Sequence, residues 1–220
     1  MCGRFTSILS PELLAAIFEV QAPPNMEARY NIAPTQLVPI IRDSSSGRFV
    51  SAARWGLVPS WSRDLKSGSH MINARCETVQ EKPAFRHSIK YRRCIVPASG
   101  YYEWEDSGGR KQPYYIQLKD ESPMGLAALW EQWKAPDGEV IETFCILTTA
   151  AGGFLMRIHD RMPLILHPDC YGLWLEKNMH DPEQLQHLYN DYPAELMTAY
   201  MVADLVNNPR FDAPACIAPL

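Results

Sequence analysis

The sequence predicts an α+β fold: a single domain over residues 1–220, made of short, mostly antiparallel strands in barrel-like mixed sheets, with peripheral helices. The 220 residues are 46% hydrophobic and 21% charged, which is ordinary for a globular chain long enough to bury a core. Short apolar segments bounded by turn residues recur along the middle of the chain, as in strands. Several of the 18 prolines stand beside these segments, where proline fits only edges or ends. A doubly wound parallel sheet is therefore not expected.

The first predicted element is a helix after Ser10. Ser10 is a favourable N-cap residue, and Pro11 suits the first helical position. An apolar face at helical spacing follows, formed by Leu13, Leu14, Ile17 and Phe18. Pro23-Pro24 is expected to end the helix.

The middle of the chain predicts strands. Segments 37–42 and 49–55 are joined by the polar turn 43–47, as in a hairpin. Further strand candidates are 94–96, 100–104, 114–118, 126–130, 140–149 and 164–166. The C-terminal part favours helix again, over 168–177, 184–190 and 193 to about 198.

Several function classes are disfavoured by composition and spacing. No apolar run reaches the roughly 18 residues of a membrane span, and the N-terminus lacks a secretory signal, so we expect a cytoplasmic protein with no membrane partner. The six cysteines are scattered and are expected to be mostly buried thiols. Neither they nor the six histidines show metal-ligand spacing, so no metal site and no cofactor are predicted.

Charge is unevenly distributed. The net charge is −4, but residues 1–100 carry +6 and residues 101–220 carry −10. The stretch 54–93 holds nine basic residues against three acidic ones. A local basic surface attracts phosphates even on an acidic protein, because salt screens charges beyond roughly 8–10 Å. The alternative is a solvated face balanced by the acidic half.

Cys2 is the first candidate for chemistry. Removal of Met1 would leave Cys2 with a free α-amine and a thiol on adjacent carbons. The amine of such a residue forms a Schiff base with an aldehyde, and the thiol then closes a five-membered thiazolidine. The same pair also suits an N-terminal nucleophile hydrolase, in which the amine activates the thiol. The remaining alternative is that a cysteine at position 2 is incidental.

Six motifs in order bear on this choice. They are MCGRF (1–5), RYNIAP (29–34), RWGLVPSW (54–61), INARCET (72–78), RCIVPASGYYEW (93–104) and IHDRMP (158–163). Together they closely resemble the SOS response-associated peptidase (SRAP) family of abasic-site processing proteins, over residues 2 to about 207. The resemblance implies a role in the DNA damage response: covalent capture of abasic sites in single-stranded DNA.

The resemblance also implies the catalytic residues. Cys2 matches the family nucleophile, and Asn73 the asparagine that orients the N-terminal residue and the opened sugar. Glu103 matches the acidic residue and His159 the histidine. These roles fit the chemistry, because opening the deoxyribose ring and losing water from a carbinolamine both need proton donors near neutral pH. For Glu103 this requires burial that raises its pKa, with Glu105 as a rim residue.

Simpler structural roles compete with these assignments. Without the family resemblance, the alternative for Glu103 is a strand-end salt bridge. For His159 it is a core histidine paired with Asp160.

DNA contacts are predicted beside these positions. Guanidinium groups suit phosphate oxygens, and tryptophans stack on bases. The predicted DNA-binding residues are Arg4, Pro34, Trp61, Arg75, Trp104 and Arg161. Single-stranded DNA is the expected partner, since its aldehyde is reached without unpairing a duplex.

Three hypotheses follow. The first is a monomeric enzyme, nucleoid-associated when bound to DNA, that crosslinks to abasic sites through Cys2 and has associated lyase activity. The second is a thiol peptidase whose main reaction is removal of its own Met1. The third is a non-catalytic reader of single-stranded DNA.

Overall fold

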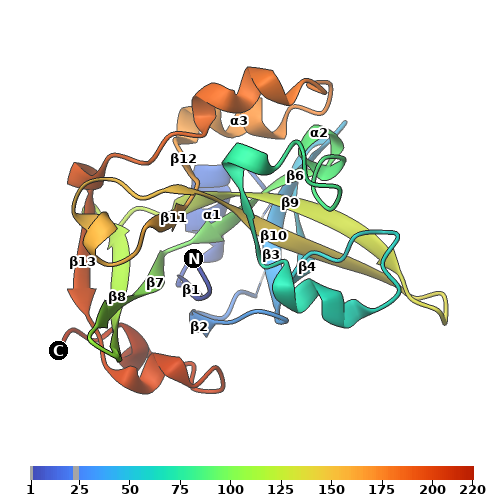
Figure 1. Ribbon diagram of the computed structural model, residues 1–220. Helices are drawn as coiled ribbons and strands as arrows, with labels where there is room; N and C mark the ends of the chain where they lie inside the picture. Colours follow the sequence, from blue (N-terminus) through green and yellow to red (C-terminus); the bar gives the residue numbers. More distant parts are fainter. Residues whose placement is uncertain (1, 22–24) are drawn as a thin grey trace.

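The computed structural model describes residues 2–21 and 25–220 (Figure 1). Met1 and the expected helix end at Pro23-Pro24 lie outside the described residues. Within them the α+β prediction is confirmed: strands make up most of the regular structure, and the helices are few and short. No helix in the described ranges is long and apolar enough to cross a membrane.

Five strands pair in a closed ring. They are β3 (Leu37–Ser44), β4 (Gly47–Trp55), β6 (Arg93–Ala98), β9 (Met124–Lys134) and β10 (Val140–Ala150). Around the ring β4 pairs with β3, β3 with β6, β6 with β9 and β9 with β10, all antiparallel. A parallel pairing of β10 with β4 closes it. Closure removes the exposed edges that an open sheet would present.

Three short strands extend this sheet. They are β5 (Asn73–Arg75), β11 (Arg161–Pro163) and β12 (Ile165–Leu166). β5 runs parallel to β10, and β11 runs antiparallel to the same strand. β12 pairs antiparallel with β9. Two of the three therefore attach to β10, which brings distant parts of the sequence together there.

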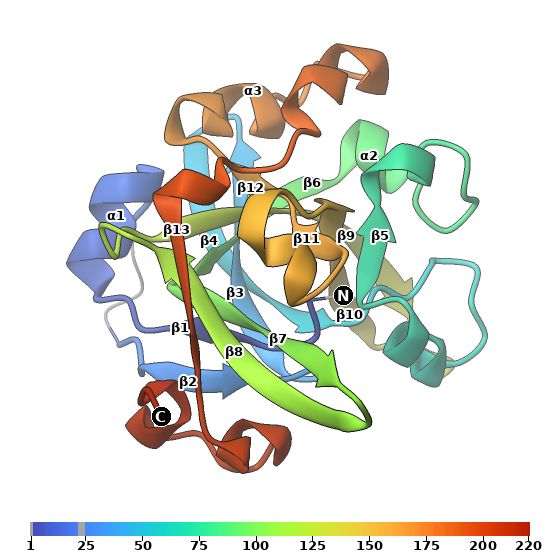
Figure 2. The same cartoon turned by 60° about the vertical axis from the view of Figure 1, so that its left-hand side comes forward.

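A second sheet of five strands packs beside the ring. Its order is β13 (Met197–Met201), β8 (Arg110–Leu118), β7 (Gly100–Ser107), β1 (Phe5–Ser7) and β2 (Arg29–Ile32), with antiparallel pairings throughout. Figure 2 shows β13, β8, β7 and β1 side by side. Only Ser99 separates β6 of the ring from β7 of this sheet. One continuous segment thus links the two sheets.

Aromatic side chains from both sheets share one buried cluster. Phe5 of β1 meets Trp55 of β4 edge to face, with ring centroids 5.1 Å apart. Trp55 stacks on Phe144 of β10 at 6.2 Å. All three side chains are fully buried, and Cys2 belongs to the same cluster. Such pairs each add about 0.5–1.5 kcal/mol beyond the burial of their area, so the N-terminal segment is held firmly against the ring.

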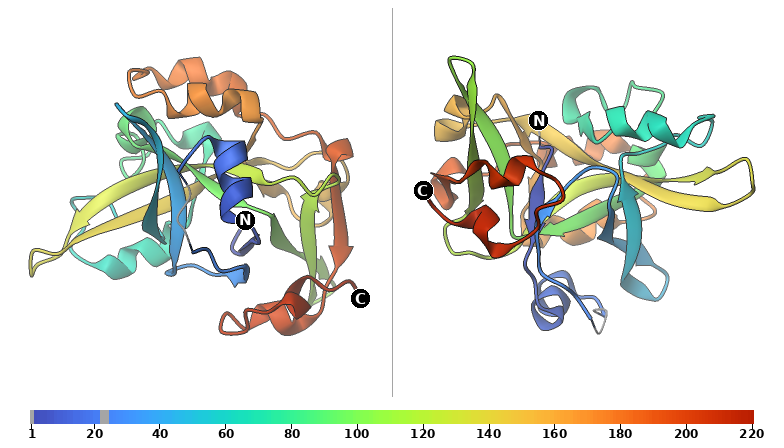
Figure 3. Two further views of the ribbon diagram at one scale, coloured as in Figure 1. Left: turned by 180° about the vertical axis from the view of Figure 1, so that it is seen from behind. Right: turned by 90° about the horizontal axis from the view of Figure 1, so that it is seen from below.

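The helices lie at the periphery. They are α1 (Pro11–Phe18), α2 (Ser88–Tyr91) and α3 (Tyr171–Leu175). As predicted, Ser10 caps α1, accepting a hydrogen bond from the Leu13 N–H at 3.2 Å. The helix ends at Phe18, because Glu19 adopts a left-handed conformation with φ 54°. Phe18 stacks on Tyr171, and the left view of Figure 3 shows α3 above α1.

The C-terminal helix prediction over 193–198 is only partly right. A single 3₁₀ turn occupies Ala194–Leu196, and Met197 then begins β13. β13 pairs with β8, placing Met197 opposite Leu118 and burying it. The gain from adding a strand to the open edge of the second sheet outweighs local helix propensity here. The predictions at 168–177 and 184–190 correspond to α3 and to a 3₁₀ helix over Pro182–Leu188.

Candidate active site

The N-terminal segment reaches the site through the pairing of β1 with β7. Phe5 lies opposite Tyr101, and the Tyr102 N–H donates to the Arg4 carbonyl at 2.9 Å. Because the strands are antiparallel, the chain before Phe5 runs alongside the residues after Tyr101. Gly100 permits the packing behind β7, since a Cβ there would lie 2.5 Å from the Tyr115 ring. Cys2 is thereby brought towards Glu103.

Cys2 is fully buried and held through its backbone. The Asn73 side-chain Nδ2 donates to the Cys2 carbonyl at 2.8 Å. Asn73 begins β5, whose parallel pairing with β10 fixes its position. Burial raises the pKa of the Cys2 thiol well above its ordinary value, and the nearby Glu103 carboxylate adds to the rise. The sulfur is therefore a protonated thiol at neutral pH.

Glu103 is the buried acid of the site. Its side chain on β7 is 3% exposed. Burial, together with the negative charge of Asp160, raises the pKa of Glu103 from 4.5 to about 7. Glu105, two residues along the same strand, is half-buried and accepts a hydrogen bond from the Tyr114 hydroxyl at 2.9 Å. Of the two carboxyls, Glu103 is therefore the one suited to move protons near neutral pH.

His159 lies in the segment just before β11. Its Nδ1 accepts a hydrogen bond from the Arg161 N–H at 2.9 Å and lies 2.9 Å from the Asp160 carboxylate. The first contact suits a neutral ring with its proton on Nε2, and the second suits a protonated ring. Burial lowers the pKa of His159, while Asp160 opposes that shift. Both protonation states of His159 therefore have a partner in place.

Glu103 and His159 line one pocket of about 410 Å³. Its other lining residues are Trp104, Lys111 and Asn207. The Trp104 indole Nε1 donates to the Asn207 Oδ1 at 2.8 Å, which orients the ring at the rim. Lys111 and Asn207 were missed in the sequence because neither lies in a motif. The signal for Lys111 is the β7–β8 hairpin, which places it opposite Asp106 of the strand that carries Glu103.

Two of the predicted DNA-binding arginines already have structural partners. Arg4 donates from Nη1 to the Asn31 Oδ1 at 2.8 Å and to the Val206 carbonyl at 2.7 Å. Arg161 binds the Glu77 carboxylate through both Nη atoms, at 2.5 and 3.0 Å, and donates to the Thr148 carbonyl. These guanidinium groups tie the N-terminal segment and β11 to their neighbours. A phosphate would have to share them with the existing partners.

The remaining predicted DNA contacts are more accessible. Trp61 is 68% exposed, and Arg75 at the end of β5 is also exposed. Pro34, in the turn after β2, and Trp104 are half-buried. Arg75 shares its short strand with Asn73, so an exposed cation lies close to the residue that holds Cys2.

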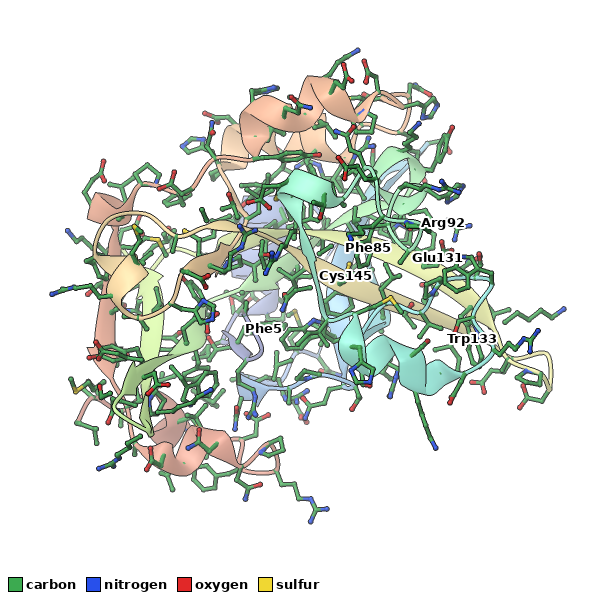
Figure 4. The ribbon with its side chains drawn as sticks, in the orientation of Figure 1. Phe5, Phe85, Arg92, Glu131, Trp133 and Cys145 are labelled. Atoms are coloured by element: carbon green, nitrogen blue, oxygen red, sulfur yellow. The ribbon has the colours of Figure 1, made fainter. Side chains whose placement is uncertain are left out.

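The basic stretch 54–93 is not uniformly a surface for DNA. Arg93 is buried and donates to the carbonyls of Trp174 and Ile89, at 2.6 and 2.8 Å. Arg92 forms an ion pair with the buried Glu131, and Figure 4 shows these two side chains next to each other. The last two cations of the stretch therefore stabilise the fold. Within residues 2–21 and 25–220, no group of histidine, cysteine, aspartate or glutamate is arranged to hold a metal ion.

The fold and the site define a protein with one mixed and one antiparallel sheet, in which a buried cysteine at position 2 lies near a carboxyl group that shares a pocket with an imidazole. A family profile described as SOS response associated peptidase (SRAP) matches residues 1–209. The chain is 41% identical over 222 residues to the abasic site processing protein YoqW of Bacillus subtilis (strain 168), with 99% of each covered. The chain belongs to the SRAP family.

Two further relatives extend the match. Identity with the abasic site processing protein HMCES of Mus musculus is 30% over 270 residues, covering all of this chain and 76% of that protein. A crystal structure of a protein from Bacteroides thetaiotaomicron matches with a TM-score of 0.89 and 30% identity, over 100% of both chains. The architecture is thus shared along the whole chain.

Proposed function

We propose that this chain is an abasic-site processing protein that captures the aldehyde of an abasic site in single-stranded DNA through Cys2. The observation that carries the proposal is the placement of Cys2, anchored by Asn73, beside Glu103 and the pocket that Glu103 shares with His159. Family membership and the names of the relatives support it.

The reaction begins with opening of the sugar. Abasic deoxyribose is mostly a closed hemiacetal, so the ring oxygen must gain a proton before the aldehyde is released. Protonated His159 supplies that proton and returns to the neutral form, in which Nδ1 accepts from the Arg161 N–H. Because burial lowers the pKa of His159, the ring gives its proton up readily.

The amine step follows. Removal of Met1 exposes the Cys2 α-amine, whose reference pKa of about 7.7–8.0 leaves a neutral fraction near pH 7.5. The amine adds to the aldehyde carbon to give a carbinolamine, which loses water to form an iminium ion. Glu103, with a pKa of about 7, donates the proton that converts the leaving hydroxyl into water.

The thiol step completes the crosslink. The Cys2 sulfur bonds to the iminium carbon, the C=N electron pair returns to nitrogen, and the thiol proton passes to the Glu103 carboxylate. The product is a thiazolidine, which resists hydrolysis better than an open imine. If the iminium instead loses a proton from the sugar, the strand is cleaved by β-elimination, so lyase activity would share the first intermediate.

Removal of Met1 by the protein itself is the second proposed activity, in keeping with the peptidase name of the family. The buried thiol makes Cys2 a weak nucleophile at neutral pH, because burial favours its protonated form. Autoproteolysis therefore requires Glu103 as the base, and purified Glu103→Gln chains should retain Met1 by intact mass. Full removal of Met1 from that variant would assign the step to another enzyme.

Cys2 variants test the main proposal. Wild type, Cys2→Ser, Cys2→Ala and Cys170→Ala are incubated with a single-stranded oligonucleotide bearing one abasic site, after intact mass confirms loss of Met1. Cys170 is a half-buried free thiol and serves as the matched control. We expect a heat-stable adduct from wild type and Cys170→Ala only. Cys2→Ser should form an imine that borohydride traps but no heat-stable product, because it keeps the amine and lacks the thiol. A heat-stable adduct from Cys2→Ala would contradict the proposal.

A further inference from the structure

The Tyr101 hydroxyl is a buried polar group without a visible role in the fold. Tyr101 is 1% exposed, and its hydroxyl has no hydrogen-bond partner among the described residues. The next residue behaves differently, since the Tyr102 hydroxyl donates to the Tyr30 carbonyl at 2.7 Å. A buried hydroxyl without a partner is unfavourable and is uncommon in folded proteins. This hydroxyl therefore points to a role during the reaction rather than in the stability of the fold.

The position of Tyr101 connects it to the site. Tyr101 precedes Glu103 by two residues on β7, so both side chains leave the strand on the same face. Across the sheet it lies opposite Phe5, on the segment that leads back to Cys2. Tyr101 and Cys2 also belong to one buried cluster. Burial raises the pKa of the Tyr101 phenol far above its ordinary value, and the Cys2 and Glu103 groups add to the rise. The phenol therefore stays protonated and can donate a hydrogen bond.

We propose that Tyr101 is a positioning residue for the thiol step, its O–H donating a hydrogen bond to the Cys2 sulfur as that sulfur gains negative charge during ring closure. This inference rests on the proposed function. The phenol keeps its proton throughout: the S–C bond forms, the C=N pair returns to nitrogen, and the thiol proton goes to Glu103. Apart from the Arg4 backbone, which contacts the Cys2 sulfur, the sulfur lies among the apolar side chains of the cluster, where an anion is costly, so a further donor lowers that cost.

The charged groups near Cys2 favour a neutral donor at the sulfur. Glu103 on β7 raises the pKa of the thiol through its negative charge, and Asp160 raises the pKa of Glu103 in turn. Two cationic groups face the same pocket, Lys111 of β8 and His159 when protonated, but Cys2 is not among its lining residues. A neutral donor within the cluster is therefore the group suited to stabilise the sulfur without attracting a counter-charge into the core.

Tyr101→Phe tests the inference, because it removes only the hydroxyl oxygen. Tyr171→Phe is the control, since Tyr171 is also 1% exposed but belongs to the other large core cluster, where its hydroxyl lies against the Gly125 backbone. For wild type and both variants, borohydride trapping measures imine formation on an abasic oligonucleotide. Heat-stable adduct formed without reductant measures ring closure, at each pH from 5 to 9.

Tyr101→Phe should form the imine at the wild-type rate and close the ring about tenfold more slowly, the value of one hydrogen bond to a charged group. The midpoint of the pH dependence of ring closure should lie at higher pH in Tyr101→Phe than in wild type, because the thiolate is harder to form. Tyr171→Phe should match wild type in both measurements. Equal closure rates and midpoints for all three proteins would overturn the inference while leaving the proposed function intact. A lower thermal midpoint for Tyr101→Phe than for Tyr171→Phe would also overturn it, by giving the hydroxyl a structural role. Failure of wild type to form any adduct would instead refute the proposed function.

Discussion

Glu103 shows how a single buried side chain prepares this site for proton transfer. An exposed glutamate would be fully ionised at neutral pH, but the enclosed carboxyl titrates at about 7 and exists in both forms. This tuning works against stability. A carboxyl whose pKa is higher in the folded than in the unfolded chain favours folding below the unfolded pKa, and that contribution is lost as pH rises through the folded pKa.

The first prediction concerns Glu103→Gln. Between pH 4 and pH 8 the difference in unfolding free energy should shift by about 3 kcal/mol in favour of glutamine, the equivalent of a rise from 4.5 to about 7. Urea denaturation at both pH values measures it. Glu105→Gln, half-buried on the same strand, is the control. A difference for Glu103→Gln that is independent of pH would show that the carboxyl is not buried as described.

At the scale of single residues, the sequence predicts the candidate site residues that lie within motifs. The resemblance to the SRAP family, carried by six short motifs, implies roles for Cys2, Asn73, Glu103 and His159, and the structure brings the carboxyl and the imidazole into one pocket. The contact between Asn73 and Cys2 joins residues 71 positions apart, so no local pattern predicts it and only the family resemblance implies it. Lys111 and the unpartnered Tyr101 hydroxyl likewise become visible only once strand register is known.

Among the elements, one buried guanidinium connects β6 with both α3 and α2. Arg93 at the start of β6 donates to the Trp174 carbonyl of α3 and to the Ile89 and Lys90 carbonyls of α2. Carbonyls in the last turn of a helix lack intrahelical partners, so Arg93 satisfies groups that would otherwise be buried without one. In sequence this arginine counted towards a basic surface, since composition does not reveal which cations are enclosed.

The second prediction follows from that contact. Arg93→Ala should lower the free energy of unfolding by about 3 kcal/mol, because several buried carbonyls lose their donor. Arg86→Ala removes an exposed cation of the same stretch and should change stability by no more than about 0.5 kcal/mol. Denaturant unfolding of the two variants measures both values. Similar effects in both would mean that Arg93 does not dock these elements.

Element prediction succeeded where strands are long and failed where pairing alone defines them. The hairpin at 37–55 and the long segment at 140–149 were recognised because alternation and turn residues mark them. β1 and β5 have three residues each, too few to carry a period. The predicted helix 193–198 overlaps the start of β13, whose strand conformation comes from pairing with the edge of β8. The short strands β1 and β5 position Cys2 and Asn73.

Taken as a whole, the molecule is acidic, yet two exposed basic side chains lie near the candidate site. Lys111 lines the pocket with Glu103 and His159, and Arg75 is exposed on the strand of Asn73. Phosphates near the site are attracted by these near charges, while the more distant acidic surface is screened. The net charge of −4 therefore does not oppose binding of single-stranded DNA at this position.

The third prediction uses the two ends of β8. Lys111 lies near its start, at the pocket, and Lys119 is an exposed lysine just beyond its end. Lys111→Ala should reduce the slope of log affinity for single-stranded DNA against log salt by about 0.7. That value corresponds to the counterions released when one phosphate is neutralised. Lys119→Ala should leave the slope unchanged, as measured by fluorescence anisotropy at several salt concentrations. Equal slopes in both variants would mean that the single-stranded DNA binds elsewhere on the surface.

The central claim is tested most directly by locating the covalent bond. The heat-stable complex formed by the Met1-free chain with an abasic oligonucleotide is digested with protease and nuclease, and the modified peptide is sequenced by mass spectrometry. The account predicts one modified residue, Cys2, with the sugar carbon joined to both its nitrogen and its sulfur and with one water lost. A sugar attached to a lysine, or to any residue other than Cys2, would contradict it.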